Sequence, residues 1–244
     1  MGTMNARKDI FARLKTTLDR VHNPTVRYSG ADQRIQDGSP ALIPERGRSE
    51  GPAKTALFVS EAERADADVR RLTHMADVPE VVKRILTEAK ITALKAAPDQ
   101  ELQAMDWADT DIAFGRGEGA DHIGLSVAYG GVAETGTLVM TSGLNAPTTL
   151  NFLPDVHMVV IREQDIAANY EEVWDRLRAD AQSDAQSDAR ADARADANAD
   201  APLLPRTVNW ITGPSRTADI EQTLLLGAHG PRKLIILLID AQTS

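Results

Sequence analysis

Two short segments of the chain combine residue types that bind or transform small molecules. The first is Ala133–Thr137, which reads Ala-Glu-Thr-Gly-Thr. The carboxylate of Glu134 can act as a general base or as a nucleophile, and glycines beside it allow tight turns and close approach of the backbone to a ligand. A turn carboxylate held by backbone N–H groups or by an arginine is the alternative. The first segment supplies one candidate catalytic residue, Glu134, and three candidate ligand contacts, Thr135, Gly136 and Thr137. Gly131, two residues before the segment, is a fourth candidate contact.

The second segment follows a predicted strand over residues 207–212 and begins Gly-Pro-Ser-Arg-Thr-Ala-Asp. This pattern predicts a helix that starts near Ser215, where free backbone N–H groups and the positive helix end would bind an anion. Arg216 can hold a carboxylate through two parallel hydrogen bonds. The alternative is that Ser215 or Thr217 only caps the helix and that Asp219 stabilises its positive end. The candidate ligand contacts here are Gly213, Ser215, Arg216, Thr217 and Asp219.

Both segments follow predicted strands of an α/β sheet, and such sheets bind ligands beyond the carboxyl ends of their strands. We therefore expect the Glu134 turn and the Gly213–Ser215 segment to meet at one rim of a parallel sheet, in a polar recess for a small anionic ligand. His229 precedes the last strand and should lie at the opposite end of the sheet. His157 begins a strand, which favours a structural role. His22, His74, His122 and His157 show no metal-ligand spacing, and we expect no metal site.

Composition narrows the class of protein. The chain has 244 residues, no cysteine and a formal net charge of −9. The lack of cysteine excludes disulfides, thiol catalysis and cysteine-ligated iron–sulfur clusters within this chain, and the negative charge argues against a nucleic-acid partner. No apolar run approaches the ~20 residues of a membrane span, and the N-terminus lacks the apolar core of a signal peptide. We expect a cytoplasmic protein without a membrane partner.

Helix and strand signals alternate along most of the chain, which favours an α/β fold with a mostly parallel sheet. The predicted helices are residues 4–21, 61–71, 79–90 and 164–178, with Asp77 as the cap of the third. The predicted strands are residues 56–59, 111–114, 123–128, 138–141, 157–162, 207–212 and 234–239.

The same patterns suggest two regions. Residues 1–54 are predicted to form an N-terminal helix and an extended arm, and residues 55–244 an α/β domain. Within that domain, residues 179–201 repeat aspartate at every fourth position among alanines. Aspartates four apart on a helix repel each other. We therefore interpret this low-complexity insertion as a solvated, mobile loop.

Residues 123–139 resemble the central motif of LUD-domain proteins, and residues 213–221 with 227–231 resemble their C-terminal signature. The resemblance is to the lactate-utilisation protein C branch and covers roughly residues 55–239, without the insertion. It implies a Rossmann-like three-layer sandwich similar to the NagB/RpiA/CoA-transferase superfamily. It also implies a place in bacterial oxidation of L-lactate to pyruvate, within a three-component system whose other members hold iron–sulfur clusters.

Three functions follow in order of preference. The first is a cluster-free accessory or ligand-binding subunit beside iron–sulfur lactate-utilisation proteins, with an oligomer as a further expectation. The second is a free-standing enzyme of the CoA-transferase or isomerase type that uses Glu134. The third is a scaffold that binds other proteins through its acidic repeat and N-terminal arm.

Overall fold

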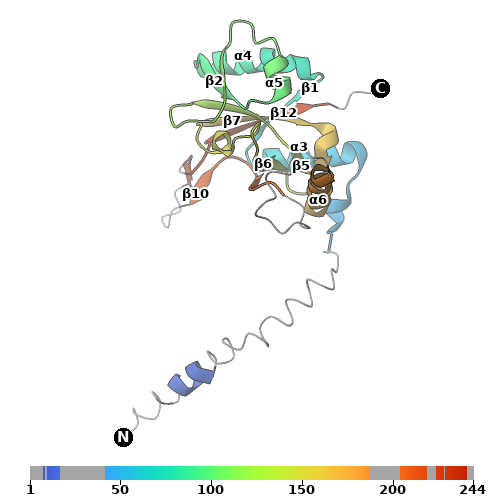
Figure 1. Ribbon diagram of the computed structural model, residues 1–244, viewed down its shortest axis with the longest axis vertical. Helices are drawn as coiled ribbons and strands as arrows, with labels where there is room; N and C mark the ends of the chain where they lie inside the picture. Colours follow the sequence, from blue (N-terminus) through green and yellow to red (C-terminus); the bar gives the residue numbers. More distant parts are fainter. Residues whose placement is uncertain are drawn as a thin grey trace. The chain divides into compact units, whose positions relative to one another are not determined.

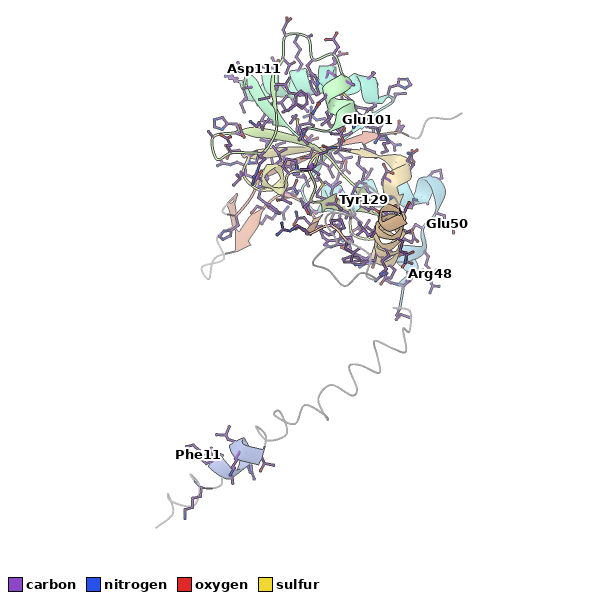
Figure 2. The ribbon with its side chains drawn as sticks, in the orientation of Figure 1. Phe11, Arg48, Glu50, Glu101, Asp111 and Tyr129 are labelled. Carbon is purple, nitrogen blue, oxygen red and sulfur yellow. The ribbon has the colours of Figure 1, made fainter. Side chains whose placement is uncertain are left out.

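The computed structural model describes residues 8, 10–16, 42–186, 204–218, 224–227 and 229–240. The chain divides into two compact units, Met1–Leu42 and Ile43–Ser244. In the first unit, residues 10–16 are helical, and Phe11 is exposed on that helix (Figure 2). This agrees with the helix predicted over residues 4–21. The other residues of that predicted helix, apart from Lys8, lie outside the described residues.

The second unit is built on a central sheet whose six described strands all run parallel (Figure 1). The strand order is β1-β12-β7-β4-β2-β3. The neighbouring strands β7 and β12, both inside the sheet, are almost entirely buried, which is why they read as continuous apolar runs. The strands are β1 Asp68–Leu72, β2 Ala93–Ala96, β3 Asp111–Phe114, β4 Ile123–Val127, β7 Val156–Arg162 and β12 Lys233–Ile239.

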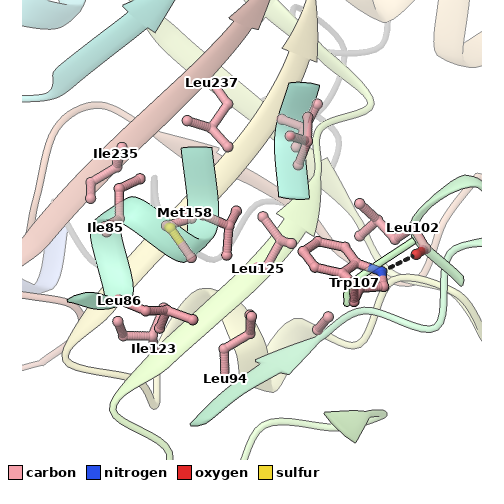
Figure 3. Close-up of a cluster of buried hydrophobic side chains, with 14 of the residues drawn as sticks. Ile85, Leu86, Leu94, Leu102, Trp107, Ile123, Leu125, Met158, Ile235 and Leu237 are labelled. Atoms are coloured by element: carbon pink, nitrogen blue, oxygen red, sulfur yellow. Dashed lines mark hydrogen bonds between the residues drawn. The ribbon is translucent and has the colours of Figure 1, made fainter. Parts of the chain in front are cut away.

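Helices α4 (Val78–Ala89) and α5 (Gln100–Ala104) cover one face of this sheet. Val78, Val82, Ile85 and Leu86 recur at helical spacing on α4 and pack on the strands. The indole N–H of Trp107 donates to the carbonyl of Leu102 at 2.7 Å within the same cluster (Figure 3). Glu101 and Asp111 lie on this side of the molecule, whereas Tyr129 lies on the opposite side (Figure 2).

The other face packs against helix α3 (Gly51–Arg64) and a second sheet of four described strands. The second sheet has the order β8-β5-β6-β9 and mixes parallel and antiparallel pairs. Helix α6 (Tyr170–Gln186) packs on β5 and β6 through Val173 and Leu177. The strands are β5 Gly130–Val132, β6 Thr137–Thr141, β8 Ile166–Ala167 and β9 Val208–Ile211.

A two-stranded antiparallel hairpin, β10 (Arg216–Ala218) and β11 (Leu224–Leu226), follows β9. Four 3-10 turns complete the described elements: η1 Glu45–Arg48, η2 Met75–Asp77, η3 Thr148–Asn151 and η4 Glu163–Asp165.

The predicted fold class is confirmed: the molecule is α/β with a mostly parallel central sheet. The strands predicted over 111–114, 123–128, 138–141, 157–162, 207–212 and 234–239 are all present within one residue at each end. The helix predicted over 79–90 is α4, with Pro79 in its first turn. No helix within the described part of the chain is long and apolar enough to cross a membrane.

Three element predictions near the start of the second unit are wrong. The strand predicted over 56–59 is part of α3, because Thr55, Phe58 and Ala62 are buried at helical spacing. The helix predicted over 61–71 therefore ends at Arg64, and β1 follows it. Asp77 does not cap α4 with its side chain; its carboxylate accepts from the backbone N–H of His74 at 2.9 Å instead.

Two further predictions need correction around α6. The helix predicted to begin at Gln164 begins at Tyr170, because Ile166 and Ala167 pair with β5 as strand β8. The helix then continues to Gln186, well into the segment that was predicted to be a loop. Residues 187–201 of that insertion lie outside the described residues.

Candidate functional site

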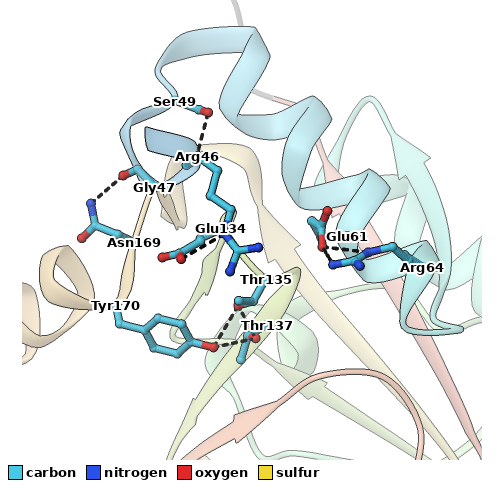
Figure 4. A network of polar contacts seen from close by, with 10 residues as sticks. All are labelled: Arg46, Gly47, Ser49, Glu61, Arg64, Glu134, Thr135, Thr137, Asn169 and Tyr170. Atoms are coloured by element: carbon cyan, nitrogen blue, oxygen red, sulfur yellow. Dashed lines mark hydrogen bonds and ion pairs between the residues drawn. The ribbon is translucent and has the colours of Figure 1, made fainter. Parts of the chain in front are cut away.

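The turn after β5 carries Glu134, and its carboxylate is held inside the fold. Only 8 % of the residue is exposed. Its Oε1 accepts a hydrogen bond from Nε of Arg46 at 3.2 Å, which comes from η1 (Figure 4). The backbone N–H of Glu134 donates to the carbonyl of Ala168 at 3.1 Å. This is the arrangement of a turn carboxylate held by an arginine, the alternative that the sequence left open.

The two threonines of the same turn form a hydroxyl network. Thr135 Oγ1 lies 2.8 Å from Tyr170 Oη and 2.7 Å from Thr137 Oγ1 (Figure 4). Thr137 Oγ1 lies in turn 2.7 Å from Thr212 Oγ1, at the end of β9. The network therefore links the Glu134 turn to the end of β9, just before Gly213. The antiparallel pairing of β6 with β9 brings the same two segments together. Its hydroxyls bond to one another, so their geometry is that of a structural cluster.

The glycines of both segments lie against other parts of the protein. A Cβ on Gly136 would stand 2.1 Å from the backbone nitrogen of Ala62, and one on Gly213 would stand 2.0 Å from the carbonyl oxygen of Ala65. Both residues have positive φ angles, 63° and 70°. A Cβ on Gly131, inside β5, would likewise stand only 2.8 Å from a ring carbon of Phe58. On the side where a side chain would project, α3 leaves no space for a ligand.

The helix predicted after Gly213-Pro-Ser is wrong for the described residues. The backbone N–H of Ser215 donates to the carbonyl of Pro231 at 2.8 Å, and the carbonyl of Ser215 accepts from Gly227 at 3.0 Å. These long-range bonds hold Ser215 extended and lead into the β10–β11 hairpin, so there is no helix start to bind an anion here. Arg216 forms an ion pair with Asp66 and donates to the carbonyl of Ala65.

Thr217 and Asp219 are the remaining candidate ligand contacts. Asp219 lies outside the described residues. Thr217 is placed in β10, opposite Leu225 on β11, but the orientation of its side chain is not described. Their ligand contacts stay predictions.

The predicted segments therefore meet, but not at a rim of the parallel sheet. They lie beside each other in the second, mixed sheet, with α3 packed against their glycines. A pocket of about 240 Å³ lies next to them, and Glu134 is not among its lining residues. Gly213 and Ser215 do line it, together with Asn151, Phe152, His157, Trp210, Ile211, Thr212, Pro214, His229, Gly230, Pro231 and Leu234.

The pocket lies at the amino ends of β7 and β12, where His157 and Leu234 are each the second residue of the strand. His229, expected at this end, also lines it. The described lining residues include no Asp, Glu, Lys or Arg. Its polar side chains are those of Asn151, His157, Trp210, Thr212, Ser215 and His229. Without a lysine or arginine among the described lining residues, the pocket differs from the anion recess predicted from the sequence.

Two buried polar residues line this pocket, Asn151 and His157. The second has the more unusual surroundings. It is 1 % exposed, and burial lowers the pKa of its imidazole to about 3. Nε2 lies 3.1 Å from Oγ of Ser126, which is also buried, while Nδ1 has no hydrogen-bond partner among the described residues. A buried polar atom without a partner is uncommon and calls for an explanation.

Sequence reasoning treated His157 as structural and passed over Asn151 and Trp210. One signal was present: His157 is a polar residue in the otherwise apolar run His-Met-Val-Val-Ile. Its alternating partners Val159 and Ile161 belong to the cluster under α3 and the second sheet, so the strand period places His157 on that inner face. Among the described residues, no group of three or more His, Asp or Glu could hold a metal ion.

The protein is thus of the α/β class, with a parallel sheet, a mixed sheet packed on it and a pocket beside their contact. Residues 55–239 match the LUD domain, and the chain belongs to this family. The chain is also similar to a solved structure, a DUF162 family protein from Deinococcus radiodurans, with a TM-score of 0.52 and 17 % identity. That similarity covers 76 % of this chain and 96 % of the other, and it supports the fold alone.

Several other proteins are similar to the chain in sequence. The chain is 27 % identical to the Escherichia coli protein YkgG over 185 residues, which is 75 % of this chain and 72 % of YkgG. It is 26 % identical over 141 residues to Lactate utilization protein C from Halalkalibacterium halodurans, covering 58 % of this chain and 54 % of that protein. The chain spans about half the length of most of the relatives it matches.

Proposed function

We propose that this protein is an accessory component of a bacterial L-lactate utilisation system, in which lactate is oxidised to pyruvate. The observation that carries the proposal is the match to the LUD domain together with similarity to proteins named Lactate utilization protein C. The match spans residues 55–239, so it includes both sheets and the pocket between them.

The proposed role is that of a subunit without a cluster, beside iron–sulfur partner proteins. Iron–sulfur clusters are held by cysteine thiolates in most proteins, and the sequence has no cysteine. Oxidation of lactate releases two electrons, which a chain of this composition has no cluster to accept. The electron-carrying cofactors would then belong to the partners.

The geometry of Glu134 supports an accessory role over a CoA-transferase-like enzyme. A carboxylate nucleophile must reach a bound acyl group. Glu134 is instead nearly buried, bonded to Arg46, and absent from the lining of the adjacent pocket. A transferase mechanism would require the Arg46 ion pair to open and the turn to move.

Deletion of the gene in its own bacterium tests the proposal. We expect the deletion strain to lose growth on L-lactate as sole carbon source and to grow normally on pyruvate, and we expect the intact gene to restore growth on lactate. Equal growth of both strains on lactate would contradict the proposed role. The Glu134→Gln variant is the matched control: an accessory role predicts that it restores growth, whereas a transferase role predicts that it does not.

Partner binding is tested separately. Affinity purification of the tagged chain from lactate-grown cells should recover proteins with the visible absorbance of iron–sulfur clusters. Suppose that deletion abolishes growth on lactate but that the tagged chain purifies without such proteins. The role in lactate utilisation would then stand, and the proposed iron–sulfur partners would be rejected.

A further inference from the structure

We propose that the pocket at the amino ends of β7 and β12 binds a small, uncharged molecule through a carboxamide or lactam edge, which pairs with the side-chain amide of Asn151. Such an edge carries an N–H donor and a carbonyl acceptor side by side. The proposal depends on the geometry of the pocket and not on the lactate pathway proposed above. It makes Asn151 a recognition residue.

Asn151 is the polar group that the fold leaves free inside the pocket. It lines the pocket, and only 4 % of the residue is exposed. No hydrogen bond joins its side-chain amide to another described residue, yet neither amide atom is closed to solvent, in contrast to Nδ1 of His157. What remains open on a residue so buried faces the pocket that it lines. An amide in this position costs free energy unless a water or a ligand pairs with it.

The amide of Asn151 determines the kind of group that fits. Its Nδ2 donates and its Oδ1 accepts. A primary carboxamide or a lactam places its own N–H and C=O on one edge, so it satisfies the donor and the acceptor at once. A ketone or an ester only accepts, and it would leave Oδ1 of Asn151 without a partner. Pairing on both atoms therefore requires a ligand that donates as well as accepts.

The other polar side chains within the pocket do not alter this requirement. Oγ1 of Thr212 lies 2.7 Å from Oγ1 of Thr137 and is engaged there. His157 is bonded to Ser126 through Nε2, and its Nδ1 is closed to solvent. The hydroxyl of Ser215 has no partner among the described residues, and it can donate or accept as the ligand requires. Ser215 thus supplies a second contact that suits the same ligand.

His229 bears on the charge of the ligand. Burial lowers the pKa of His157 to about 3, so that ring is neutral at physiological pH. The described lining has no lysine or arginine, and the imidazole of His229 is then the one described lining group that can become a cation. His229 is exposed whereas Asn151 is buried, so a carboxylate paired with this imidazole would lie at the mouth. Burying an unpaired carboxylate at Asn151 is costly, and the group bound there is therefore uncharged.

The rest of the pocket suits a small organic molecule. A Cβ on Gly230 would lie 3.7 Å from Oγ of Ser215 and 4.0 Å from the ring of Phe152, so the hydroxyl and the aromatic ring flank one narrow point. Apolar walls with few polar groups are typical of sites for small organic ligands, and the volume of about 240 Å³ limits the ligand to a small one. The apolar walls are formed by Phe152, Pro214, Pro231 and Leu234.

Three probes of equal size test the pairing: benzamide, which donates and accepts, acetophenone, which only accepts, and benzoate, which is charged. Each is titrated into the full chain, and binding is followed by the side-chain amide signals in ¹H–¹⁵N spectra. The signals of Asn151 are assigned by their loss in Asn151→Leu. The side-chain amide of Asn169 is the internal control, because it is bonded to Gly47 and Glu172 and does not line the pocket.

We expect benzamide to shift the Asn151 signals in a saturable way and to leave the Asn169 signals in place. Acetophenone should bind more weakly by roughly twofold to tenfold, the range for loss of one neutral hydrogen bond, and benzoate should bind more weakly still. Failure of all three probes to shift the Asn151 signals overturns the proposal. So does equal binding of acetophenone, which would show a plain apolar cavity, or tightest binding of benzoate, which would show an anion site at His229.

The Asn151→Leu variant places the preference on this side chain. Leucine has a similar volume, and the exchange leaves no described group without its partner, because the amide has none. Binding to this variant is followed by the backbone N–H signal of Gly230, which also lines the pocket. Benzamide should bind no more tightly than acetophenone. A retained preference for benzamide would assign recognition to another group and overturn the proposal.

The Gly230→Ala variant tests the location even if Asn151→Leu does not fold. The added methyl group would make ordinary contacts of 3.4 to 4.0 Å with Ser215 and Phe152, so the fold should persist while the pocket narrows. We expect all three probes to bind more weakly. Gly119→Ala, whose Cβ meets nothing within 4 Å, is the matched control and should leave binding unchanged. Undiminished binding to Gly230→Ala would place the probes outside the pocket and overturn the proposal.

Discussion

At the scale of single residues, His157 links the pocket to the pH dependence of folding. Burial lowers the pKa of the folded imidazole to about 3, against 6.5 for the ordinary side chain. As the pH falls below about 6.5, the unfolded chain binds a proton that the folded chain does not, so stability is lost between these two pKa values. Each pH unit inside that window lowers the free energy of unfolding by about 1.4 kcal/mol.

The His157→Phe variant should lack this loss. We expect the free energy of unfolding, measured in urea, to fall more steeply from about pH 6 to pH 5 in wild type than in the variant. The difference in slope should be about 1.4 kcal/mol per pH unit, which corresponds to one proton. Asp155, whose pKa is lowered by its hydrogen bond with His122, is present in both proteins and cancels in the comparison. Parallel pH profiles would mean that the histidine is protonated in the folded protein.

Gly136 gives a second test at this scale, with Gly51 as its matched control. Both have a positive φ, 63° and 53°. A Cβ at Gly136 would meet the backbone of Ala62 at 2.1 Å, whereas a Cβ at Gly51 would meet nothing within 4 Å. We expect Gly51→Ala to cost about 1 kcal/mol from backbone strain alone, and Gly136→Ala to cost at least about 3 kcal/mol because α3 must also move. Urea midpoints measure both; equal losses would mean that α3 does not pack on the turn.

At the scale of elements, the sequence predicts half of the twelve described strands, namely β3, β4, β6, β7, β9 and β12, and misses β1, β2, β5, β8 and the β10–β11 hairpin. The runs that became β4, β7 and β12 are buried on both faces, and burial of that kind leaves a continuous apolar signal. The run Ala56–Val59 has the same local appearance but lies on a helix, because four apolar residues fit either period. Only the burial of Ala62 further along distinguishes the two.

The hairpin after β9 was missed for a different reason. Ser215 and the acidic residues after it form a local pattern typical of a helix start. The backbone bonds of Ser215 to Pro231 and Gly227 override that pattern. Arg46 reaches Glu134 across 88 positions of the chain, and this separation likewise leaves no trace in any local motif. The sequence thus predicted that the two segments lie close together. It could not predict the pocket, because the pocket is formed by contacts between distant segments.

The attachment of α6 to the second sheet gives the prediction at this scale. Arg176 on α6 donates to the carbonyl of Tyr129 at 2.8 Å and stacks 4.5 Å from its ring centre. A Cβ at Gly130 would lie 2.0 Å from the guanidinium. We expect Gly130→Ala to displace Arg176, to cost about 1–3 kcal/mol and to speed amide exchange in α6. Gly143→Ala, where a Cβ meets nothing within 4 Å, is the control and should leave that exchange unchanged.

At the scale of the whole molecule, the question is where the folded unit begins. The sequence places the start of the domain at Thr55, where matching to the LUD domain also begins. The structure includes residues from Ile43 onward in the second compact unit. The segment before Thr55 supplies Arg46 to Glu134, and the carbonyl of Gly47 accepts from the buried amide of Asn169 at 2.8 Å.

Two truncated chains therefore separate the two boundaries. A chain that starts at Ile43 keeps every described residue of the three buried apolar clusters and both of these polar contacts. We expect its free energy of unfolding to match that of the full chain within about 0.5 kcal/mol. A chain that starts at Thr55 removes the partners of Glu134 and Asn169 together with the first turn of α3, and it should lose about 2–4 kcal/mol.

Urea unfolding of the two truncated chains beside the full chain measures the difference. The Arg46→Ala variant of the full chain distinguishes the ion pair from the rest of the segment. Since Arg46 is largely exposed, this variant should lose less than about 1 kcal/mol. Most of the loss at Thr55 would then come from the buried amide of Asn169 and from the shortened helix. If the chain that starts at Thr55 were as stable as the one that starts at Ile43, residues 43–54 would be an arm, as their composition alone suggested.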